Sequence, residues 1–336
     1  MSDAPWIVAP QVELDLRRRL VDQVEAFPPE LIERGRQLLQ SIWSELPKKA
    51  LKLAPLIHLR TGFLFRREAA AYAKAVGVDP REIIVANIIY DLALSQMGCS
   101  SAAIATPDGP VLARNMDWLP EGPLARATAT IRLTLKNGAK ITHAGFPGSI
   151  GVVTGMSSRG FAIALNAVPA PGGTDRLGYP VLLLIRKVLE GASTFAAAVQ
   201  RLSKTRLTSG AVFTVVGRQN SERVVIERGP RVFALRRPEG DEPLVATNHF
   251  RVLFPDMLPA ANNDLQIAGA NAGRYHCLLQ SLPDDSQRHS DEALLYRLSD
   301  PGVIQDYTAQ HVIARPYADE FRTWVPQRLQ SASSES

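Results

Sequence analysis

One cysteine lies where the sequence changes character, and its neighbours suit nucleophilic chemistry. Cys99 begins a short apolar run that turns at Asp108-Gly109 and returns as a second run carrying Arg114 and Asp117. Two such runs joined by a turn predict adjacent antiparallel strands. A cation and an anion beside a cysteine adjust the pKa of its thiol, and the thiolate is the nucleophile. The pattern therefore predicts a tuned nucleophile at Cys99, about a third of the way along the chain, where self-cleavage would expose it as a new N-terminus.

The elements that must position these residues form an α+β pattern. Residues 1–98 are expected to be mostly helical, with a short strand at 11–16 and a helix that begins at Asp79-Pro80 and ends near Gln96. From Cys99 onward the residue pattern predicts mainly strands, with helices between some of them. The predicted strands are 125–135, 140–146, 148–154, 160–166, 211–237, 245–250 and a closing hairpin at 311–325, and the predicted helices are 179–189, 194–203, 270–282 and 291–298. This order predicts sheets layered between helices.

Composition excludes several classes of protein. The formal net charge is +5, without a dense basic face or a nucleic-acid-binding motif, so we expect no nucleic-acid partner. The two cysteines, Cys99 and Cys277, form no CxxC pattern, and no HExxH motif occurs. We therefore expect no metal ion and no other cofactor. The N-terminus lacks the pattern of a signal peptide, and no apolar run reaches the length of a membrane span, so a cytoplasmic location is expected.

Several motifs occur together in an informative order. Cys99-Ser100-Ser101 is followed by Gly109 and by Arg114-Asn115-Met116-Asp117-Trp118, then by residues 145–155, Leu165-Asn166, Thr247-Asn248 and Arg274. This series resembles the N-terminal-nucleophile cysteine hydrolases of the choloylglycine hydrolase, acid ceramidase and N-acylethanolamine acid amidase superfamily. Some features, such as Gly98 and Thr247-Asn248-His249-Phe250, resemble the penicillin acyltransferase-like branch better. The resemblance spans most of residues 99–325 and implies a four-layer αββα sandwich.

The resemblance implies a role for each matched residue. Cys99 would attack the Gly98 carbonyl, and after cleavage its α-amine, with a reference pKa of about 7.7–8.0, would act as base for its own thiol. Arg114 would favour the thiolate, and Asp117 would hold either Arg114 or the new amine. The implied oxyanion donors are Asn166 and Asn248, and Arg274 would support the charge of the site.

Each of these residues also has a structural interpretation. Cys99 could be a small buried apolar residue, and Arg114 with Asp117 an ordinary ion pair. The two asparagines could be turn formers, and Arg274 a surface residue. The sequence also departs from the ceramidases, because Ala167-Val168 stand where those enzymes carry Glu-Arg after Leu-Asn.

The resemblance predicts an amidase that cleaves itself between Gly98 and Cys99 and hydrolyses the linear amide bond of an N-acyl amide lipid through a thioester. Residues 1–98 would form one chain, 99–330 the catalytic chain that stays associated with it, and 331–336 a disordered tail. The alternatives are an acyltransferase, a hydrolase of bile-salt or β-lactam-type amides, and a non-catalytic lipid-binding relative. The apolar stretch 51–65, flanked by basic residues, could form the mouth of the acyl pocket or touch a membrane surface, and it could equally be an ordinary packed helix.

Overall fold

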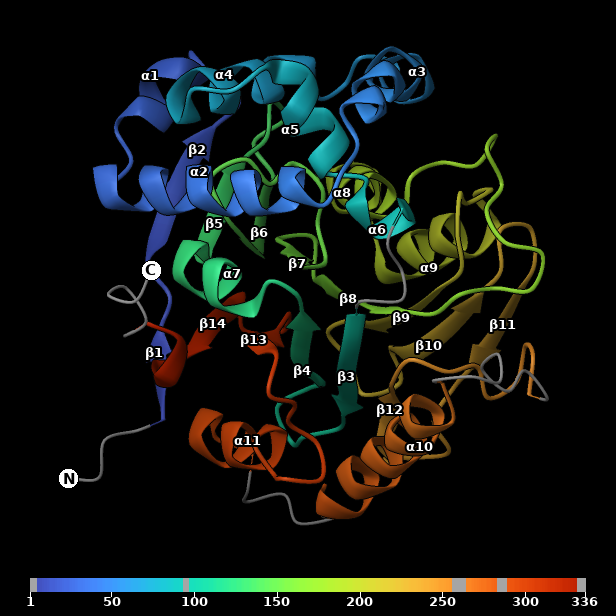
Figure 1. Ribbon diagram of the computed structural model, residues 1–336. Helices are drawn as coiled ribbons and strands as arrows, with labels where there is room; N and C mark the ends of the chain where they lie inside the picture. The colour runs from blue at the N-terminus through green and yellow to red at the C-terminus, as the bar shows by residue number, and fades with distance from the viewer. Residues whose placement is uncertain (1–4, 93–96, 256–263, 283–288, 331–336) are drawn as a thin grey trace.

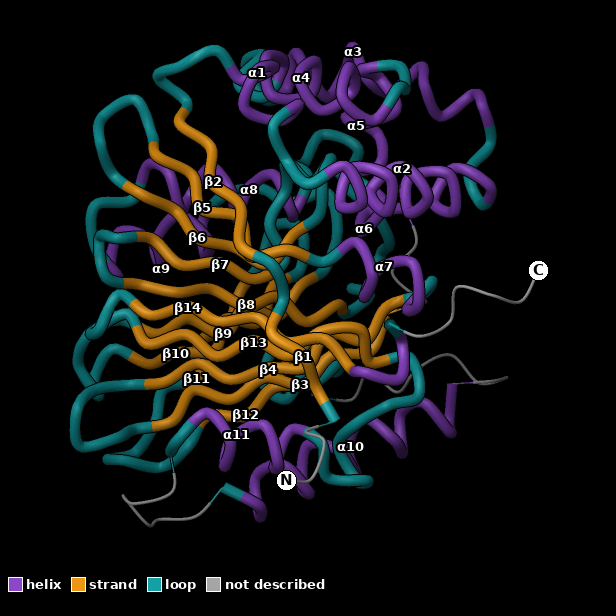
Figure 2. The backbone as a smooth tube through the Cα atoms, turned by 90° about the vertical axis from the view of Figure 1, so that its left-hand side faces the viewer, coloured by secondary structure: helices purple, strands orange, loops and turns teal. Residues whose placement is uncertain are grey.

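Two β-sheets face each other, and helices cover the outer face of each one (Figure 1). The computed structural model describes residues 5–92, 97–255, 264–282 and 289–330. The predicted tail 331–336 and the end of the helix expected to reach Gln96 lie outside these residues. Figure 2, turned by 90°, shows the strands in the middle, with α1 to α5 above them and α10 and α11 below.

Within the described residues, the strands form one six-stranded and one eight-stranded sheet. The first sheet has the order β1 (Trp6–Val8), β14 (Glu320–Pro326), β13 (Thr308–Arg315), β4 (Val111–Trp118), β3 (Met97–Ile104) and β12 (Leu244–Ala246). The second has the order β11 (Phe233–Arg236), β10 (Arg223–Arg228), β9 (Ala211–Val216), β8 (Phe161–Ala167), β7 (Thr154–Ser157), β6 (Lys140–Gly145), β5 (Ala129–Thr134) and β2 (Gln11–Asp15). Neighbouring strands are antiparallel except for the parallel pair of β2 and β5.

The helices fall into three groups. Before β3 come α1 (Leu20–Glu25), α2 (Pro29–Ser44), the 3-10 helix η1 (Lys48–Leu53), α3 (Ala54–Arg60), α4 (Arg66–Val76), α5 (Pro80–Ala86) and α6 (Ile89–Leu92). The middle of the chain adds α7 (Glu121–Ala127), α8 (Val181–Gly191) and α9 (Phe195–Lys204), and the end adds α10 (Asp264–Ser281), α11 (Asp291–Leu298) and the 3-10 helix η3 (Gln327–Leu329).

Three apolar layers hold the sandwich together. Val212, Val225 and Val312 belong to the layer between the two sheets. A second layer packs the first sheet against α10 and α11, and the largest one packs the second sheet against α8, α9 and the N-terminal helices. The predicted four-layer αββα arrangement is therefore confirmed, with α10 and α11 as one outer layer and α8 and α9 as the other (Figure 1).

The N-terminal segment contributes one strand to each of the two sheets. The predicted strand at 11–16 exists as β2, which pairs with β5, while the unpredicted β1 pairs with β14. The three-residue strand β1 carries too little alternation to be read from sequence. The first 98 residues therefore contribute strands as well as helices.

Two sequence predictions are wrong for one shared reason. The helix expected from Asp79 to near Gln96 breaks after Ala86, and the strand expected at 148–154 is an irregular segment before β7. Asn87 lies at the break, where its Nδ2 donates to the carbonyl oxygens of Ile83 and Gly148 at 2.7 and 2.8 Å. Its Oδ1 accepts from the backbone N–H groups of the next residues, 150 and 151, at 2.7 and 2.8 Å. One asparagine thus ends the helix and replaces the hydrogen bonds of a strand.

Among the described residues, none of the helices combines the length and the apolar character that crossing a membrane requires.

Candidate active site

The alternation of β3 gives Cys99 and Ser100 different surroundings. Successive side chains of a strand point to opposite faces of its sheet. Ser101 donates to Asn166 on β8 of the second sheet at 2.7 Å, so Cys99, two residues earlier, faces the same interior. Ser100 points the other way and accepts a 3.0 Å hydrogen bond from Arg274 on α10. The thiol therefore lies between the sheets, at the beginning of its strand.

The register of β3 and β4 separates the two charged residues of β4. Ser101 lies opposite Arg114, and Gly98 lies opposite Asp117. Arg114 is thus on the thiol's face of the sheet, where it donates to Thr154 Oγ1 at 2.6 Å. Asp117 is on the other face, with Arg274. The expected cation beside the thiol is present, but the anion belongs to a different cluster.

The surroundings of the thiol act on its pKa in opposite directions. Burial raises the pKa of Cys99, because the ionised sulfur loses its solvation. The positive charge of Arg114 lowers it, the carboxylate of Asp117 raises it, and a hydrogen bond from the Asp117 backbone lowers it again. The net result is a raised pKa of the Cys99 thiol, which favours its protonated form in the intact chain.

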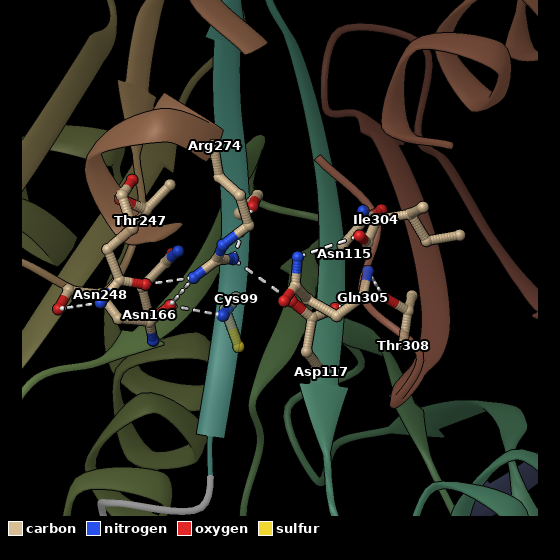
Figure 3. Close-up of polar contacts among 12 residues, drawn as sticks. Cys99, Asn115, Asp117, Asn166, Thr247, Asn248, Arg274, Ile304, Gln305 and Thr308 are labelled. Atoms are coloured by element: carbon tan, nitrogen blue, oxygen red, sulfur yellow. Dashed lines mark hydrogen bonds and ion pairs between the residues drawn. The ribbon is translucent and has the colours of Figure 1, made fainter. Parts of the chain in front are cut away.

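The backbone nitrogen of Cys99 is held by Asn248 (Figure 3). This N–H donates to Asn248 Oδ1 at 2.6 Å, and Arg274 donates to the same oxygen at 3.0 Å. Asn248 Nδ2 donates in turn to the carbonyl oxygen of Ala167 at 2.8 Å, which fixes the orientation of the amide. The nitrogen of the bond that would be cleaved, and of the amine that would result, therefore has a fixed acceptor.

Arg274 is the centre of the second cluster rather than a surface residue. Its side chain is buried and forms a 3.3 Å ion pair with Asp117, besides its bonds to Ser100 and Asn248. Thr308 donates to the other carboxylate oxygen of Asp117 at 2.6 Å. Burial still raises the pKa of Asp117 to about 6, against the opposing effect of Arg274. Of the two partners expected for Asp117, Arg114 is excluded, because the two β4 residues lie on opposite faces of the sheet, and Arg274 takes its place. The other expected partner, the amine of Cys99, stays a prediction.

Asn166 is buried beside the thiol's strand, and its hydrogen bonds are with protein groups. Its Oδ1 accepts from Ser101, and its Nδ2 donates to the carbonyl oxygen of Ala246 at 3.1 Å. Figure 3 shows Asn166 and Asn248 on one side of Cys99 and Asp117 on the other. The six sequence-predicted residues of the site are therefore brought together, while the oxyanion role of the two asparagines stays a prediction.

Gly98 is confined by the groups around it. A Cβ at this position would lie 3.0 Å from the hydroxyl of Tyr307 and 3.4 Å from a carboxylate oxygen of Asp117. A side chain at this position would therefore fit only if these neighbours moved away from it.

An apolar cavity opens next to the residue that pairs with Cys99 on the neighbouring strand. Its wall includes Met116, which lies directly opposite Cys99 and so shares its face of the sheet. The described wall is formed by Leu38, Ile42, Ala86, Asn87, Ile89, Met116, Trp118, Leu119, Pro120, Leu124, Ala144, Gly145, Phe146, Ser149, Gly151, Val153, Leu182 and Gln310. The stretch 51–65, expected as one form of the pocket mouth, contributes nothing to this described wall.

Sequence reasoning missed several residues of the site. Asn271 accepts a hydrogen bond from Arg274, and their spacing of three on one helix was a signal for a shared face. Thr308 and Tyr307 approach from β13 and the turn before it, and only the register of that strand with β4 reveals them. Among the described residues, no cluster of three or more His, Cys, Asp or Glu side chains is arranged to hold a metal ion.

Comparisons with known proteins agree with this geometry. Residues 104–295 match the family model described as acyl-coenzyme A:6-aminopenicillanic acid acyl-transferase. An N-acylethanolamine-hydrolyzing acid amidase of Caenorhabditis elegans is 27% identical, over 77% of this chain and 76% of that protein. A human acid ceramidase is 26% identical, over 58% of this chain and 55% of that protein.

A solved structure shows the shared fold. The Caenorhabditis elegans N-acylethanolamine-hydrolyzing acid amidase ortholog superposes with a TM-score of 0.55 at 23% identity, covering 68% of this chain and 99% of that chain. The fold, the family model and the sequence motifs agree. The chain belongs to the acyl-coenzyme A:6-aminopenicillanic acid acyl-transferase family.

Proposed function

We propose that this protein is an amidase that activates itself by cleavage and then hydrolyses the linear amide bond of an N-acyl amide lipid. One observation carries the proposal. The Gly98–Cys99 peptide joins a glycine with little room for a side chain to a buried cysteine. The nitrogen of this cysteine is held by Asn248, and its thiol lies on the face of Arg114. Both relatives named above are amide hydrolases by name, which supports the same reaction class for this chain.

The first reaction is the cleavage of the chain itself. Cys99 Sγ attacks the carbonyl carbon of Gly98, the C–N bond breaks, and the nitrogen of Cys99 takes up the thiol proton. Water then hydrolyses the thioester, which leaves a carboxylate on Gly98 and a free α-amine on Cys99. Asn248 would hold this amine through the same Oδ1 that accepts from the amide.

The second reaction repeats this chemistry on a substrate. The α-amine of Cys99 accepts the thiol proton while the sulfur attacks the amide carbonyl, and it returns that proton to the leaving amine. Water hydrolyses the acyl-thioester and releases the fatty acid. Amide N–H groups of Asn166 or Asn248 would stabilise the oxyanion, a contribution of about 3 kcal/mol for one donor.

The cavity beside Cys99 supports an apolar acyl group. Leucine, isoleucine, methionine and aromatic side chains dominate its wall, and it begins at the residue opposite the nucleophile. An acyl chain attached to Sγ would enter it past Met116. We therefore propose substrates of the N-acylethanolamine or ceramide type.

Trapping the acyl-enzyme tests this function. Processed wild-type protein, incubated briefly with a fatty-acyl ethanolamide and quenched in acid, should gain the mass of the acyl group on the fragment that begins with Cys99. Cys99→Ala should gain none, and Cys277→Ala, the matched cysteine control, should label as the wild type does. Hydrolysis without any acylated Cys99, or with equal labelling of the Cys99→Ala protein, would refute the thioester mechanism.

Acyl transfer is the second candidate, because the family model is described as an acyl-transferase. The same thioester would then be attacked by an amine instead of water. Adding amine acceptors to the assay separates the two reactions, since a transferase forms a new amide and a hydrolase still releases the free acid.

We also propose that the stretch 51–65 contacts a lipid surface. Leu56, Leu59, Phe63 and Leu64 are 47, 70, 53 and 50% exposed, and Lys48, Lys49, Lys52, Arg66 and Arg67 are exposed around them. Apolar side chains surrounded by cations are typical of segments that lie in a membrane interface. Sedimentation with anionic vesicles should recover the wild-type protein and much less of Leu59→Ser/Phe63→Ser. Equal recovery of both would remove the proposal.

A further inference from the structure

One polar group in the wall of the apolar cavity lacks a partner. Among its described residues, the wall contains three buried polar side chains, Asn87, Ser149 and Gln310. The amide of Asn87 makes four hydrogen bonds with the backbone, and Ser149 Oγ both donates to and accepts from the backbone of Phe146. Gln310 Oε1 is buried and has no hydrogen-bond partner among the described residues. An unpaired buried acceptor is unfavourable, so a residue that keeps one suggests a ligand that satisfies it.

The orientation of the Gln310 amide is fixed by its neighbours. Gln310 Nε2 donates to Thr128 Oγ1 at 2.7 Å, and the hydroxyl of Thr128 donates its single hydrogen to the carbonyl oxygen of Leu124 at 2.7 Å. Because that hydrogen is already used, the group facing Thr128 must be the amide nitrogen. Oε1 is therefore the end of the glutamine that remains available at the cavity wall.

The strand register gives the position of this acceptor relative to the nucleophile. Met116 lies opposite Cys99 on β3 and opposite Gln310 on β13. Directly opposite residues share a face of the sheet, so the three side chains form a row across three strands. Adjacent strands are about 4.8 Å apart, which puts Gln310 about 10 Å from Cys99 across the sheet. An acyl chain that leaves Sγ and crosses Met116 reaches Gln310 several carbons beyond its carbonyl.

We propose that the preferred acyl group carries a hydroxyl in the middle of its chain, and that this hydroxyl donates a hydrogen bond to Gln310 Oε1. The inference rests on the proposed function for the position of the acyl group. Gln310 is then a specificity-determining residue, since a site that pairs a substrate hydroxyl disfavours the analogue that lacks it. The rest of the wall stays apolar and accepts the methylene groups on either side.

Binding to the uncleaved chain tests this inference directly. The Cys99→Ala protein keeps the cavity and cannot turn over, so calorimetry can compare a long-chain fatty acid with its singly hydroxylated forms, the hydroxyl moved stepwise along the chain. At least one mid-chain hydroxy acid should bind about tenfold tighter than the plain acid, the size expected for one buried hydrogen bond. Adding Gln310→Met should abolish that preference and strengthen binding of the plain acid. Adding Gln40→Met, the same change at an exposed position of α2, should leave the preference intact.

Other outcomes decide against the inference. No binding of any acid, no preference for any hydroxyl position, or a preference that survives Gln310→Met would overturn it. If the Gln310→Met variant does not fold, Thr128→Val can replace it in the test. This change keeps Gln310 but removes the hydroxyl that orients its amide, so the preference for the hydroxylated acid should decrease.

The readout also separates this inference from the proposed function. A hydroxyl preference in binding, with no amide hydrolysis by the wild type, would refute the amidase and keep the acceptor role of Gln310. Amide hydrolysis by the wild type without a hydroxyl preference would keep the amidase and refute the acceptor role of Gln310.

Discussion

Two groups of residues contact Cys99 from different sides of its strand. The thiol lies on the face of Arg114, while the backbone nitrogen bonds Asn248, which Arg274 holds from the face of α10. Arg114 lowers the pKa of the thiol from its own face, and the second cluster acts on the same pKa, because Asp117 raises it and Arg274 lowers it. Changes at Arg114 should therefore act on the ionisation of the sulfur, while changes at Arg274 should act both on the position of the Cys99 nitrogen and on the pKa of the thiol.

At Gly98, adding a single methyl group tests the close approach of Tyr307. Gly98→Ala should slow self-cleavage at least tenfold, because the new Cβ would lie 3.0 Å from the Tyr307 hydroxyl and displace the scissile carbonyl. Adding Tyr307→Phe removes that hydroxyl and should restore part of the rate, while Tyr307→Phe alone should cleave nearly as fast as the wild type. The measurement is the rate of appearance of the two fragments. A double variant slower than Gly98→Ala would show that Tyr307 assists the reaction instead of only limiting space.

The residues of the site were predictable from sequence to different extents. Cys99, Arg114 and Asp117 could be found because a hairpin brings them together over a short stretch of chain. The partner of Asp117 could not, since it depends on which face of the sheet each β4 residue occupies and on how α10 packs there. Gln310 looked like any glutamine of a strand until the register placed it beside Met116.

Among the elements, the segment before β7 depends on Asn87. Its side chain bonds four backbone groups, two of them the N–H groups of Ile150 and Gly151. Asn87→Ala would leave buried groups unpaired and should lower the free energy of unfolding by about 3 kcal/mol. Denaturant titration of the Cys99→Ala protein with and without this change measures the difference, and Gln40→Ala on the exposed face of α2 is the control. A loss no larger than that of the control would contradict the anchoring role.

The same residue explains where the prediction of elements failed. Asn-Gly at 137 and 138 predicted the hairpin of β5 and β6 correctly, because the signal for such a turn is local. The helix through Asn87 and the strand at 148–154 were wrong, because a side chain far away in sequence supplies the hydrogen bonds that either element would have made. Local pattern cannot report a contact between residues sixty positions apart.

At the scale of the whole molecule, the segment before Cys99 is bound to the rest by more than its helices. β1 pairs with β14, β2 pairs with β5, and the largest apolar layer mixes side chains from both sides of the Gly98–Cys99 peptide. The two fragments should therefore remain associated after cleavage and coelute in size-exclusion chromatography, separating only in denaturant. Dissociation in native buffer would contradict this account of the interface.

The buried ionisable groups predict how stability changes with pH. Burial lowers the pKa of His143 and His311 to about 3 and that of His249 to about 4, so the unfolded chain binds more protons than the native one below about pH 6.5. Burial raises the pKa of Asp91 to about 7 and that of Asp117 to about 6, so these two carboxyl groups bind more protons in the native chain than in the unfolded one. Two carboxyl groups oppose three histidines, so the effect of the histidines prevails.

The free energy of unfolding should therefore rise between about pH 4.5 and 6, by roughly 1.4 kcal/mol per pH unit for one net proton. Denaturant titrations of the Cys99→Ala protein at several pH values measure the slope. Adding His143→Leu removes one of the three histidines and should flatten it. A stability that falls over this range would mean that the buried carboxylates dominate.

The most direct test of the central claim is the intact mass of purified protein over time, at acidic and at neutral pH, for the wild type and for Cys99→Ala. We predict that the wild type yields two fragments whose masses place the cut between Gly98 and Cys99, while Cys99→Ala stays whole under the same conditions. A wild-type chain that stays whole throughout, even with candidate lipid amides added, would contradict the claim that Cys99 becomes an N-terminal nucleophile.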